Sequence, residues 1–592
     1  CSSDLMEKRW VIKKVADNKI IEPLSKALNI NHKLANLLAQ RGIKSYQTAK
    51  SFFRPEISKL HDPFLMKGMD KAINRLEKAR ENGEKILVYG DYDVDGTTAV
   101  SIVYSFLKGT HKLVDFYIPD RYNEGYGISF KGIDYAVSEG HTLMISLDCG
   151  IKAVEKVEYA NKKGLDIIIC DHHRPGDKIP EAIAVLDPKQ NDCNYPFKEL
   201  SGAGVGFKLI QALAARFEMP PETTYAFLDL VAISIAADMV AIVGENRTLS
   251  YFGLENLNMS PRIGITYLLN SAGIKKRTSL GPTHYFDRKI TITDLVFLIG
   301  PKINAAGRID SATDSVRLLI SNNKGHTIRL GNQINELNLT RRKLDTNITR
   351  EALQMLANRE SGNGVSKKAS IVYNANWHKG VVGIVASRLI DNYYRPTVVL
   401  TRADGLITGS ARSVKGFDVY NAIESTSHLL ENFGGHTYAA GMSLKPENLE
   451  SFITEFNKYT EENITQEMLI PEIEIDTELF ISDINYKFYK ILRQFAPFGP
   501  GNMSPVFLTK NVIDTGYVKL VGKNDESKHL KFSAVHPDRT GNPVPSIAFN
   551  QARHFKKMKE GKIFDICYHI EENFWLGNTT LQLRVLDIKF HD

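Results

Sequence analysis

Three apolar segments, each followed at once by acidic or histidine residues, limit the fold of this chain more than any other feature. The segments are residues 85–90 (KILVYG), 142–147 (TLMISL) and 165–170 (LDIIIC). Runs of this length that are rich in branched apolar side chains are typical of strands buried on both faces of a parallel sheet. Helical spacing in residues 98–107 and 153–163 completes a βαβ pattern, so the sequence predicts an α/β fold.

Polar residues come directly after each predicted strand. They are residues 91–96 (DYDVDG), 148–150 (DCG) and 171–173 (DHH). In open α/β sheets the ligand crevice lies at the carboxyl ends of the strands. We therefore expect the three segments to converge on one site.

The residue types in these segments indicate a metal site. Crowded carboxylates repel one another unless they share protons or bind cations. Oxygen ligands with one or two imidazoles suit Mn²⁺ better than zinc, which prefers sulfur or closed tetrahedral sites. The ligands suffice for two ions that share a bridging carboxylate, and such pairs cleave phosphoesters by activating water and stabilising the leaving oxygen.

Taken alone, some of these signals have simpler interpretations. Residues 91–96 could form a solvated turn or an isolated calcium loop, although the glutamate of a full calcium loop is absent where Val100 and Ser101 stand. The glycine-rich residues 202–206 (GAGVG) do not match G-x-G-x-x-G, and we expect a packing or substrate-side turn there. No P-loop sequence occurs, which disfavours an ATP-driven motor.

Composition is consistent with a soluble protein of several domains. The 592 residues are 43% hydrophobic and 24% charged, and the net charge of +7 permits a basic channel for nucleic acid without demonstrating one. The five cysteines form no CxxC pair and are typical of reduced residues in a cytoplasmic protein. No run of eighteen apolar residues predicts a membrane span. We expect residues 1–5 to precede a natural start at Met6, the alternative being a lipoprotein that begins at Cys1.

The pattern along the chain predicts five parts. They are a helical lead-in (1–60), the parallel-sheet domain (61–270), a connecting region with a long helix (271–360), a second α/β domain (361–465) and a C-terminal β-barrel like an OB-fold (471–592).

The long helix of the connecting region is predicted from apolar spacings of three, four or seven residues. Its apolar face is Leu330, Ile334, Leu337, Leu344, Ile348 and Met355. We expect Arg341, Arg342 and Lys343 on its polar side, either solvated or lining a DNA path.

In the second α/β domain we expect a strand at 370–373, a helix at 383–391 and a strand at 397–400. Gly434 and Gly435, taken alone, favour a tight turn that precedes a core helix.

Short alternating strands separated by turn residues predict the C-terminal barrel. The expected strands are 505–508, 512–520, 528–533, 545–549, 563–570 and 581–590. Basic and aromatic residues alternate there, for example Lys531 with Phe532 and Arg553 with Phe555, as single-strand binding requires. Ordinary barrel packing is the alternative.

The acidic segments and several downstream motifs resemble, in order, those of the DHH phosphoesterase superfamily and, within it, the RecJ family of bacterial single-stranded-DNA exonucleases. The motifs are residues 90–96, 147–150, 171–173, 237–240 (ADMV), 304–308 (NAAGR), 409–412 (GSAR) and 434–436 (GGH). The resemblance runs from about Leu60 to the C-terminus. It implies that 61–270 is the DHH catalytic domain and 361–465 the DHH-associated, substrate-binding domain.

The resemblance implies a metal-dependent exonuclease that hydrolyses single-stranded DNA 5′→3′ in recombination and repair, with two Mn²⁺ or Mg²⁺ ions. The implied metal ligands are Asp93, Asp95, Asp148, His172 and Asp238, with Asp148 as the bridge. Asp91 is a further catalytic candidate, and His173 would contact the scissile phosphate or assist the leaving group. Two-metal relatives often have a histidine where Tyr89 stands, so the first metal could be bound more weakly or held partly by Asp91.

The implied phosphate contacts are Arg308, Arg412 and His436, with Arg121, Ser410 and Gly435 as companions. The expected partner is single-stranded DNA, with a helicase and a single-strand-binding protein as further candidates, and we expect a cytoplasmic monomer. Two other classes remain: a DHH phosphodiesterase acting on short oligonucleotides or cyclic dinucleotides, and a non-catalytic nucleic-acid-binding relative. The long helix and the barrel argue against the first, and the intact acidic motifs argue against the second.

Overall fold

The computed structural model divides the chain into two compact units. The sheet unit comprises residues 50–341 and 495–503, and the barrel unit comprises the rest. The described residues are 7–277, 284–360, 368–522, 527–575 and 578–591. The prediction for the start of the chain at residues 1–6 and the first residues of the predicted second α/β domain, 361–367, lie outside them. Within these ranges, no helix is both long enough and apolar enough to cross a membrane.

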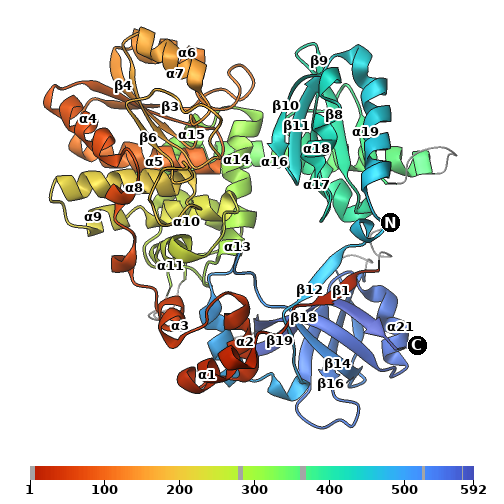
Figure 1. Cartoon of the computed structure of the whole chain (residues 1–592). Helices are drawn as coiled ribbons and strands as arrows, with labels where there is room; N and C mark the ends of the chain where they lie inside the picture. Colours follow the sequence, from red (N-terminus) through yellow and green to blue (C-terminus); the bar gives the residue numbers. More distant parts are fainter. Residues whose placement is uncertain (1–6, 278–283, 361–367, 523–526, 576–577, 592) are drawn as a thin grey trace. The chain divides into compact units, whose positions relative to one another are not determined.

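The sheet unit contains a five-stranded sheet in which every neighbouring pair is parallel (Figure 1). In spatial order the strands are β3 (Val114–Tyr117), β2 (Lys85–Gly90), β4 (His141–Leu147), β5 (Asp166–Cys170) and β6 (Ala184–Leu186). The three predicted strands are therefore confirmed, because their apolar runs are buried on both faces.

Helices cover both faces of this sheet. One face packs on α4 (Met69–Glu81), α5 (Val94–Thr110) and α8 (Gly202–Arg216), and the other on α6 (Phe130–Ser138) and α7 (Val154–Lys162). Ile86 and Val88 enter the first core, while Leu87 and Tyr89 enter the second, as the two-residue period of a strand requires. Further helices are α9 (Glu222–Tyr225), α10 (Leu228–Ala237), α11 (Gly244–Met259), α12 (Ile263–Asn270), α13 (Ile292–Asp294), α14 (Gly300–Ile309) and α15 (Thr313–Ile320).

The long helix α16 (Lys324–Glu360) joins the two units. Leu330, Ile334 and Ile348 are buried, as predicted. The prediction for Arg341 was wrong: this side chain is buried and donates to Asn338 Oδ1 at 3.0 Å. Burying a charged guanidinium is unfavourable unless it is hydrogen-bonded, and Asn338, one turn earlier in the helix, provides such a bond.

The second α/β part of the barrel unit, residues 368–463, contains a five-stranded sheet. Its order is β10 (Leu430–His436), β11 (Ala439–Leu444), β9 (Leu406–Arg412), β8 (Thr397–Ala403) and β7 (Ser370–Tyr373), with α17 (Val382–Tyr393), α18 (Val419–Glu424) and α19 (Leu449–Asn463). The predicted turn at Gly434 and Gly435 was wrong. Both lie in β10, and a Cβ at Gly435 would be 2.3 Å from the Ala439 carbonyl oxygen, so this hairpin requires glycine.

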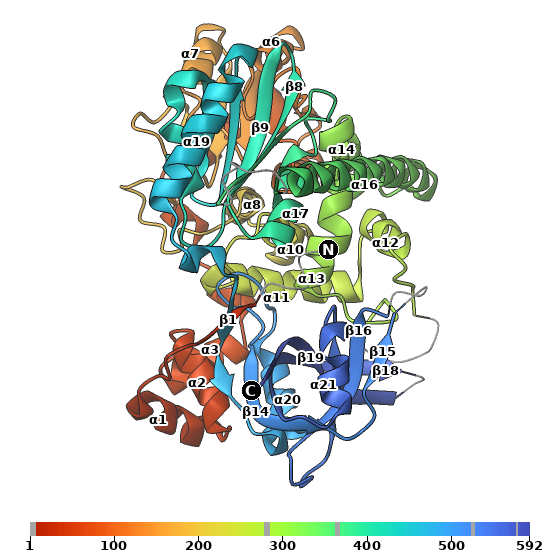
Figure 2. The same cartoon turned by 90° about the vertical axis from the view of Figure 1, so that its right-hand side faces the viewer.

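The C-terminal part is a closed five-stranded barrel (Figure 2). Its strands are β14 (Phe507–Asp514), β18 (Phe564–Trp575), β19 (Asn578–Phe590), β17 (Val544–Ala548) and β16 (His529–Val535), with α20 (Tyr486–Leu492) and α21 (Phe555–Lys559) beside them. The predicted strand at 512–520 was wrong. Asp514 accepts the N–H groups of Gly516 and Val518, so the chain turns before β15 (Lys519–Val521).

The N-terminal region packs on the barrel and is not wholly helical. Its first described element is a strand, β1 (Arg9–Ile12), which pairs in parallel with β12 (Glu472–Ile475). Trp10 Nε1 donates to Asp587 Oδ2 at 2.9 Å. Helices α1 (Asn18–Leu28), α2 (His32–Gln40) and α3 (Tyr46–Phe53) follow.

Candidate active site

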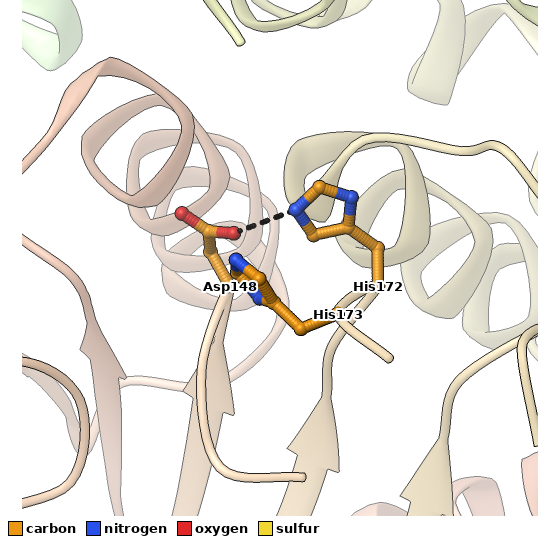
Figure 3. A group of neighbouring side chains, drawn as sticks. All are labelled: Asp148, His172 and His173. Atoms are coloured by element: carbon orange, nitrogen blue, oxygen red, sulfur yellow. Dashed lines mark ion pairs between the residues drawn. The ribbon is translucent and has the colours of Figure 1, made fainter. Parts of the chain in front are cut away.

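The acidic and histidine residues that follow β2, β4 and β5 converge at the carboxyl edge of the parallel sheet, as the strand ends predict. His172 lies at their centre. Its Nε2 atom is 3.2 Å from Asp148 Oδ1 (Figure 3), 3.7 Å from Asp95 Oδ2 and 3.7 Å from Asp238 Oδ2. Its Nδ1 atom is 3.1 Å from the Leu200 carbonyl oxygen. That contact favours the tautomer in which Nδ1 donates and Nε2 is free to bind a cation.

Four buried polar atoms at this edge lack a hydrogen-bond partner among the described residues: Asp91 Oδ2, Asp148 Oδ1, His172 Nε2 and Asp187 Oδ2. Such atoms are costly unless a ligand satisfies them. Two groups of side chains each bring one ligand atom per residue within 4.8 Å of the others: Asp148 with His172 and His173, and Asp95 with His172 and Asp238. The donor set therefore fits a divalent cation bound through oxygen and imidazole nitrogen.

Asp95 is held in place by the start of helix α8. Its carboxylate accepts the N–H groups of Gly202 and Ala203 at 2.7 Å each, and the Ser234 hydroxyl at 2.7 Å. A helix N-terminus stabilises a carboxylate through its free N–H groups and its dipole. The expected turn at 202–206 was therefore wrong, because these glycines begin a helix that packs against the site.

Gly202 also allows α8 to approach Asp148. A Cβ at position 202 would be 2.7 Å from both Cβ and Oδ1 of Asp148. Real Cβ contacts are longer, so a side chain at this position would displace Asp148.

Gly202→Ala is expected to lower kcat by about 10²-fold, because a displacement of about 1 Å in a catalytic group has that effect. Gly204→Ala is the matched control, since its nearest neighbour would be Leu200 Cβ at 3.4 Å. Steady-state rates on a single-stranded oligonucleotide compare the two variants. Equal rates would show that the approach of α8 does not set the position of Asp148.

The local backbone positions Asp148 and Asp93. Asp148 has φ of 60°, a left-handed conformation that Asp and Asn tolerate better than most residues. Asp93 is the N-cap of α5, and its Oδ1 accepts the Gly96 N–H at 3.0 Å. A Cβ at Gly96 would be 2.4 Å from the Asp91 carbonyl oxygen, so glycine lets α5 start directly beside the strand end.

The crowded carboxyl groups have raised pKa values. Burial, followed by the charges of neighbouring aspartates, raises the pKa of Asp148 and of Asp91 well above the ordinary value. Burial and the charges of Asp95 and Asp93 raise the pKa of Asp238 to about 8, although 30% of its side chain is exposed. Bound cations would relieve this repulsion.

Mn²⁺ is expected to raise the Tm more at pH 8 than at pH 6. Because the folded pKa values exceed the unfolded value of about 4, the stability these groups contribute is fully present below that pH. This contribution to stability is lost as the pH rises through the pKa of each group in the folded protein, which is about 8 for Asp238. At pH 6 the ion must also displace bound protons. Thermal unfolding with Mn²⁺ or with a chelator at both pH values measures this, and a larger Mn²⁺ shift at pH 6 would contradict it.

His173 is oriented by Asp171, a residue whose role the sequence does not reveal. His173 Nδ1 lies 2.7 Å from Asp171 Oδ1, and its Nε2 lies 3.2 Å from the Tyr126 hydroxyl. Although burial opposes both charges, this pair lowers the pKa of Asp171 to about 2 and raises the pKa of His173 to about 8. His173 is therefore mostly protonated at neutral pH in the absence of metal.

Tyr89 does not point toward the ligand atoms. Its hydroxyl donates to the Gly127 carbonyl at 2.8 Å and accepts the Ser129 N–H at 3.2 Å, on the α6 face of the sheet. The Gly127 N–H lies 3.4 Å from Asp91 Oδ1. Tyr89 thus supports the loop that contacts Asp91.

The residues expected to contact phosphate fall into two groups. Arg121 and Arg308 belong to the sheet unit: the Arg121 guanidinium lies 4.9 Å from the centre of the Tyr92 ring, and the Tyr122 hydroxyl donates to the Arg308 carbonyl. Tyr92 stands between Asp91 and Asp93, and a Cβ at Gly307, the residue before Arg308, would be 2.5 Å from the Tyr92 carbonyl oxygen. Both arginines therefore belong to the surroundings of the acidic segment.

The second group belongs to the barrel unit. His436 pairs with Ala439 and Ala439 with Arg412, so His436 and Arg412 share one face of the sheet. Ser410 is on that face too, and Arg412 Nη1 donates to its hydroxyl at 2.8 Å. Gly435 precedes His436 and is exposed, and its lack of a side chain lets the two strands of the hairpin approach each other.

Known domain families match three regions of the chain. They are the DHH family N-terminal domain at 85–235, the DHHA1 domain at 366–462 and the RecJ OB domain at 475–587. The single-stranded-DNA-specific exonuclease RecJ of Bacillus subtilis (strain 168) is 35% identical over 98% of this chain and 70% of its own length. The chain belongs to the RecJ family. Haemophilus influenzae RecJ is 31% identical over 94% of this chain and 96% of its own length.

A solved RecJ structure supports the same assignment. The structure of Thermus thermophilus RecJ in complex with Mn²⁺ matches with a TM-score of 0.81 and 25% identity, covering 99% of this chain and 80% of that one. The expected fold is therefore confirmed: a parallel-sheet DHH domain, a DHHA1 domain and a C-terminal OB barrel.

Proposed function

We propose that this protein is a metal-dependent exonuclease that degrades single-stranded DNA 5′→3′ by phosphodiester hydrolysis, in DNA recombination and repair. The observation that carries the proposal is the group of carboxylates around His172 Nε2, with unsatisfied buried atoms on Asp148 and His172. RecJ relatives are named as single-stranded-DNA-specific exonucleases, and one was solved with Mn²⁺. The intact acidic set argues against a non-catalytic relative.

The cofactor is two Mn²⁺ or Mg²⁺ ions, which would supply an activated water and neutralise charge on the phosphate. The proposed ligands are Asp93, Asp95, Asp148, His172 and Asp238, with Asp148 as the bridge. Protonated His173, held by Asp171, would donate a hydrogen bond to the scissile phosphate or to the leaving oxygen. Asp91, whose buried Oδ2 lacks a partner among the described residues, remains a catalytic candidate.

Basic and polar side chains outside the metal site are the proposed substrate contacts. Arg412, Ser410 and His436 share a sheet face suited to a phosphate, with the exposed Gly435 as their companion beside His436. Arg121 and Arg308 would contact phosphates near the acidic segment. The barrel would bind the strand through its interleaved basic and aromatic residues, such as exposed Phe549 beside His529.

Arg412→Ala is expected to reduce the preference for 5′-phosphorylated over 5′-hydroxyl ends. Arginine can clamp a phosphate with two parallel hydrogen bonds, and alanine removes both. Initial rates on the two substrates give the ratio. Arg402→Ala, an exposed arginine on the adjacent strand β8, is the matched control. A ratio unchanged from wild type in Arg412→Ala would place Arg412 outside the end pocket.

The proposal extends to organisation and partners. We propose the five-part division at 1–60, 61–270, 271–360, 361–465 and 471–592 as functional domains, and a monomer that acts with a helicase and a single-strand-binding protein. Four described cysteines are buried free thiols, which supports a cytoplasmic location.

Digestion of a panel of substrates with Mn²⁺ tests the proposed function. Long single strands should be cleaved much faster than a blunt duplex of the same sequence or a dinucleotide. Rapid cleavage of the dinucleotide alone would favour the small-substrate phosphodiesterase, and binding without cleavage at every Mn²⁺ concentration would favour a non-catalytic relative.

A further inference from the structure

Three consecutive polar residues at the start of α11 are buried and have no part in the proposed chemistry. Glu245, Asn246 and Arg247 are 5%, 0% and 5% exposed. Buried polar groups need partners, and each of these finds them in a different segment. Glu245 pairs with buried Lys208 at 2.6 Å. The other two contact segments that lead back to the metal site.

Arg247 forms hydrogen bonds with residues 495–503, a segment that we call the strap. The strap belongs to the sheet unit, although the chain on either side of it belongs to the barrel unit. The guanidinium donates to the carbonyl oxygens of Phe495 at 2.9 Å, Ala496 at 2.9 Å and Pro497 at 3.3 Å. Its rigid planar fork spreads its N–H donors over three nitrogen atoms, whereas a lysine carries all of its donors on one nitrogen.

The strap contacts the Asp238 loop (residues 238–243), which joins α10 to α11. The N–H of Ile242 donates to the Pro500 carbonyl at 2.7 Å. Gly501, at φ of 74°, allows a close approach: a Cβ there would be 2.9 Å from Val243 Cγ1. The strap therefore packs directly on the loop that begins with a proposed metal ligand.

Asn246 also forms a hydrogen bond with the Asp238 loop. Its side-chain amide donates to the Ala241 carbonyl at 3.1 Å and also to the carbonyl of Glu199. The residue after Glu199 supplies the carbonyl that contacts His172 Nδ1. One buried amide thus ties the backbone carrying Asp238 to the backbone that orients His172.

We propose that Arg247 and Asn246 are positioning residues for metal binding. Through the strap and the Asp238 loop, they fix Asp238 Oδ2 relative to His172 Nε2, two atoms that lie 3.7 Å apart. This inference rests on the proposed function, since it assumes that both side chains bind the metal. If the inference holds, metal affinity depends on the strap, a segment flanked on both sides in the sequence by residues of the barrel unit.

The test is Mn²⁺ binding by the full chain, followed by the electron paramagnetic resonance signal of free Mn²⁺. Arg247→Lys is expected to weaken binding at one of the two ions by about tenfold, the lower end of the effect of removing a group that supports a ligand. Activity should recover at saturating Mn²⁺, because the ligands themselves remain. Arg262→Lys is the matched control, since Arg262 pairs with Asp229 and donates to the Ala226 carbonyl without touching the strap.

Gly501→Ala provides a second variant that leaves Arg247 intact and pushes the strap from Val243; it should weaken Mn²⁺ binding in the same way. The inference would be overturned if both variants fold and bind Mn²⁺ with the affinity of the wild type, and if their Tm falls no more than that of Arg262→Lys. If Asp148→Asn also bound Mn²⁺ like wild type, the proposed metal site itself would fail. If Asp148→Asn lost Mn²⁺ while the strap variants kept it, only the positioning role would fail.

Discussion

Asp148→Asn is expected to lower hydrolysis by about 10³-fold or more, because the proposed bridging ligand supports both ions and metal activation supplies most of the catalysis. Asparagine keeps the shape of the side chain and tolerates the left-handed backbone at this position, where φ is 60°. Alanine at this position would add backbone strain to the loss of the ligand, which makes asparagine the cleaner test.

Single-turnover rates with saturating DNA measure this effect, and circular dichroism checks the fold. Asp134→Asn is the control, since Asp134 is an exposed residue of α6 that pairs with Lys163. Turnover of folded Asp148→Asn within a few-fold of wild type would remove the dinuclear proposal.

Deleting residues 471–592 is expected to inactivate the enzyme on short and long strands alike. The deletion removes the strap, which supplies three backbone carbonyls to Arg247 and packs on the Asp238 loop. Hydrogen bonds to a charged group contribute about 1.5–3 kcal/mol each, so losing these three should lower the free energy of unfolding of the sheet unit by about 4.5–9 kcal/mol. Misplacing the Asp238 loop should lower the rate by at least about 10²-fold.

A deletion of residues 504–592 is the informative comparison, because it keeps the strap and removes the barrel strands. This shorter deletion should cleave short oligonucleotides at near the full rate but bind long strands weakly. Each lost stacked base weakens binding by about 1–3 kcal/mol. Equal activity of the two deletions on short oligonucleotides would show that the strap does not support the metal site.

The sequence predicts the strands and the acidic strand ends well because both are local signals. Residues 85–90 form β2 with the predicted bounds, since a buried parallel strand needs an unbroken apolar run. The rule that parallel strand ends share one edge then places Asp91, Asp148 and His172 together.

The supporting contacts could not be predicted because they depend on tertiary packing. Nothing local in residues 202–206 shows that this helix start packs on Asp148, or that its N–H groups bind Asp95. Arg341 looks solvated in sequence but is buried beside Asn338. The strap was missed for the same reason: residues 495–503 pack on a unit whose other residues, 50–341, lie far from them in the sequence.

The most direct test of the proposed function is a time course of Mn²⁺-dependent digestion of one single strand labelled at either end. A 5′→3′ exonuclease should release the 5′ label at once as a mononucleotide and shorten the 3′-labelled strand progressively. Both reactions should stop with a chelator and in Asp148→Asn. Immediate release of the 3′ label instead, or digestion that persists without metal, would contradict the account.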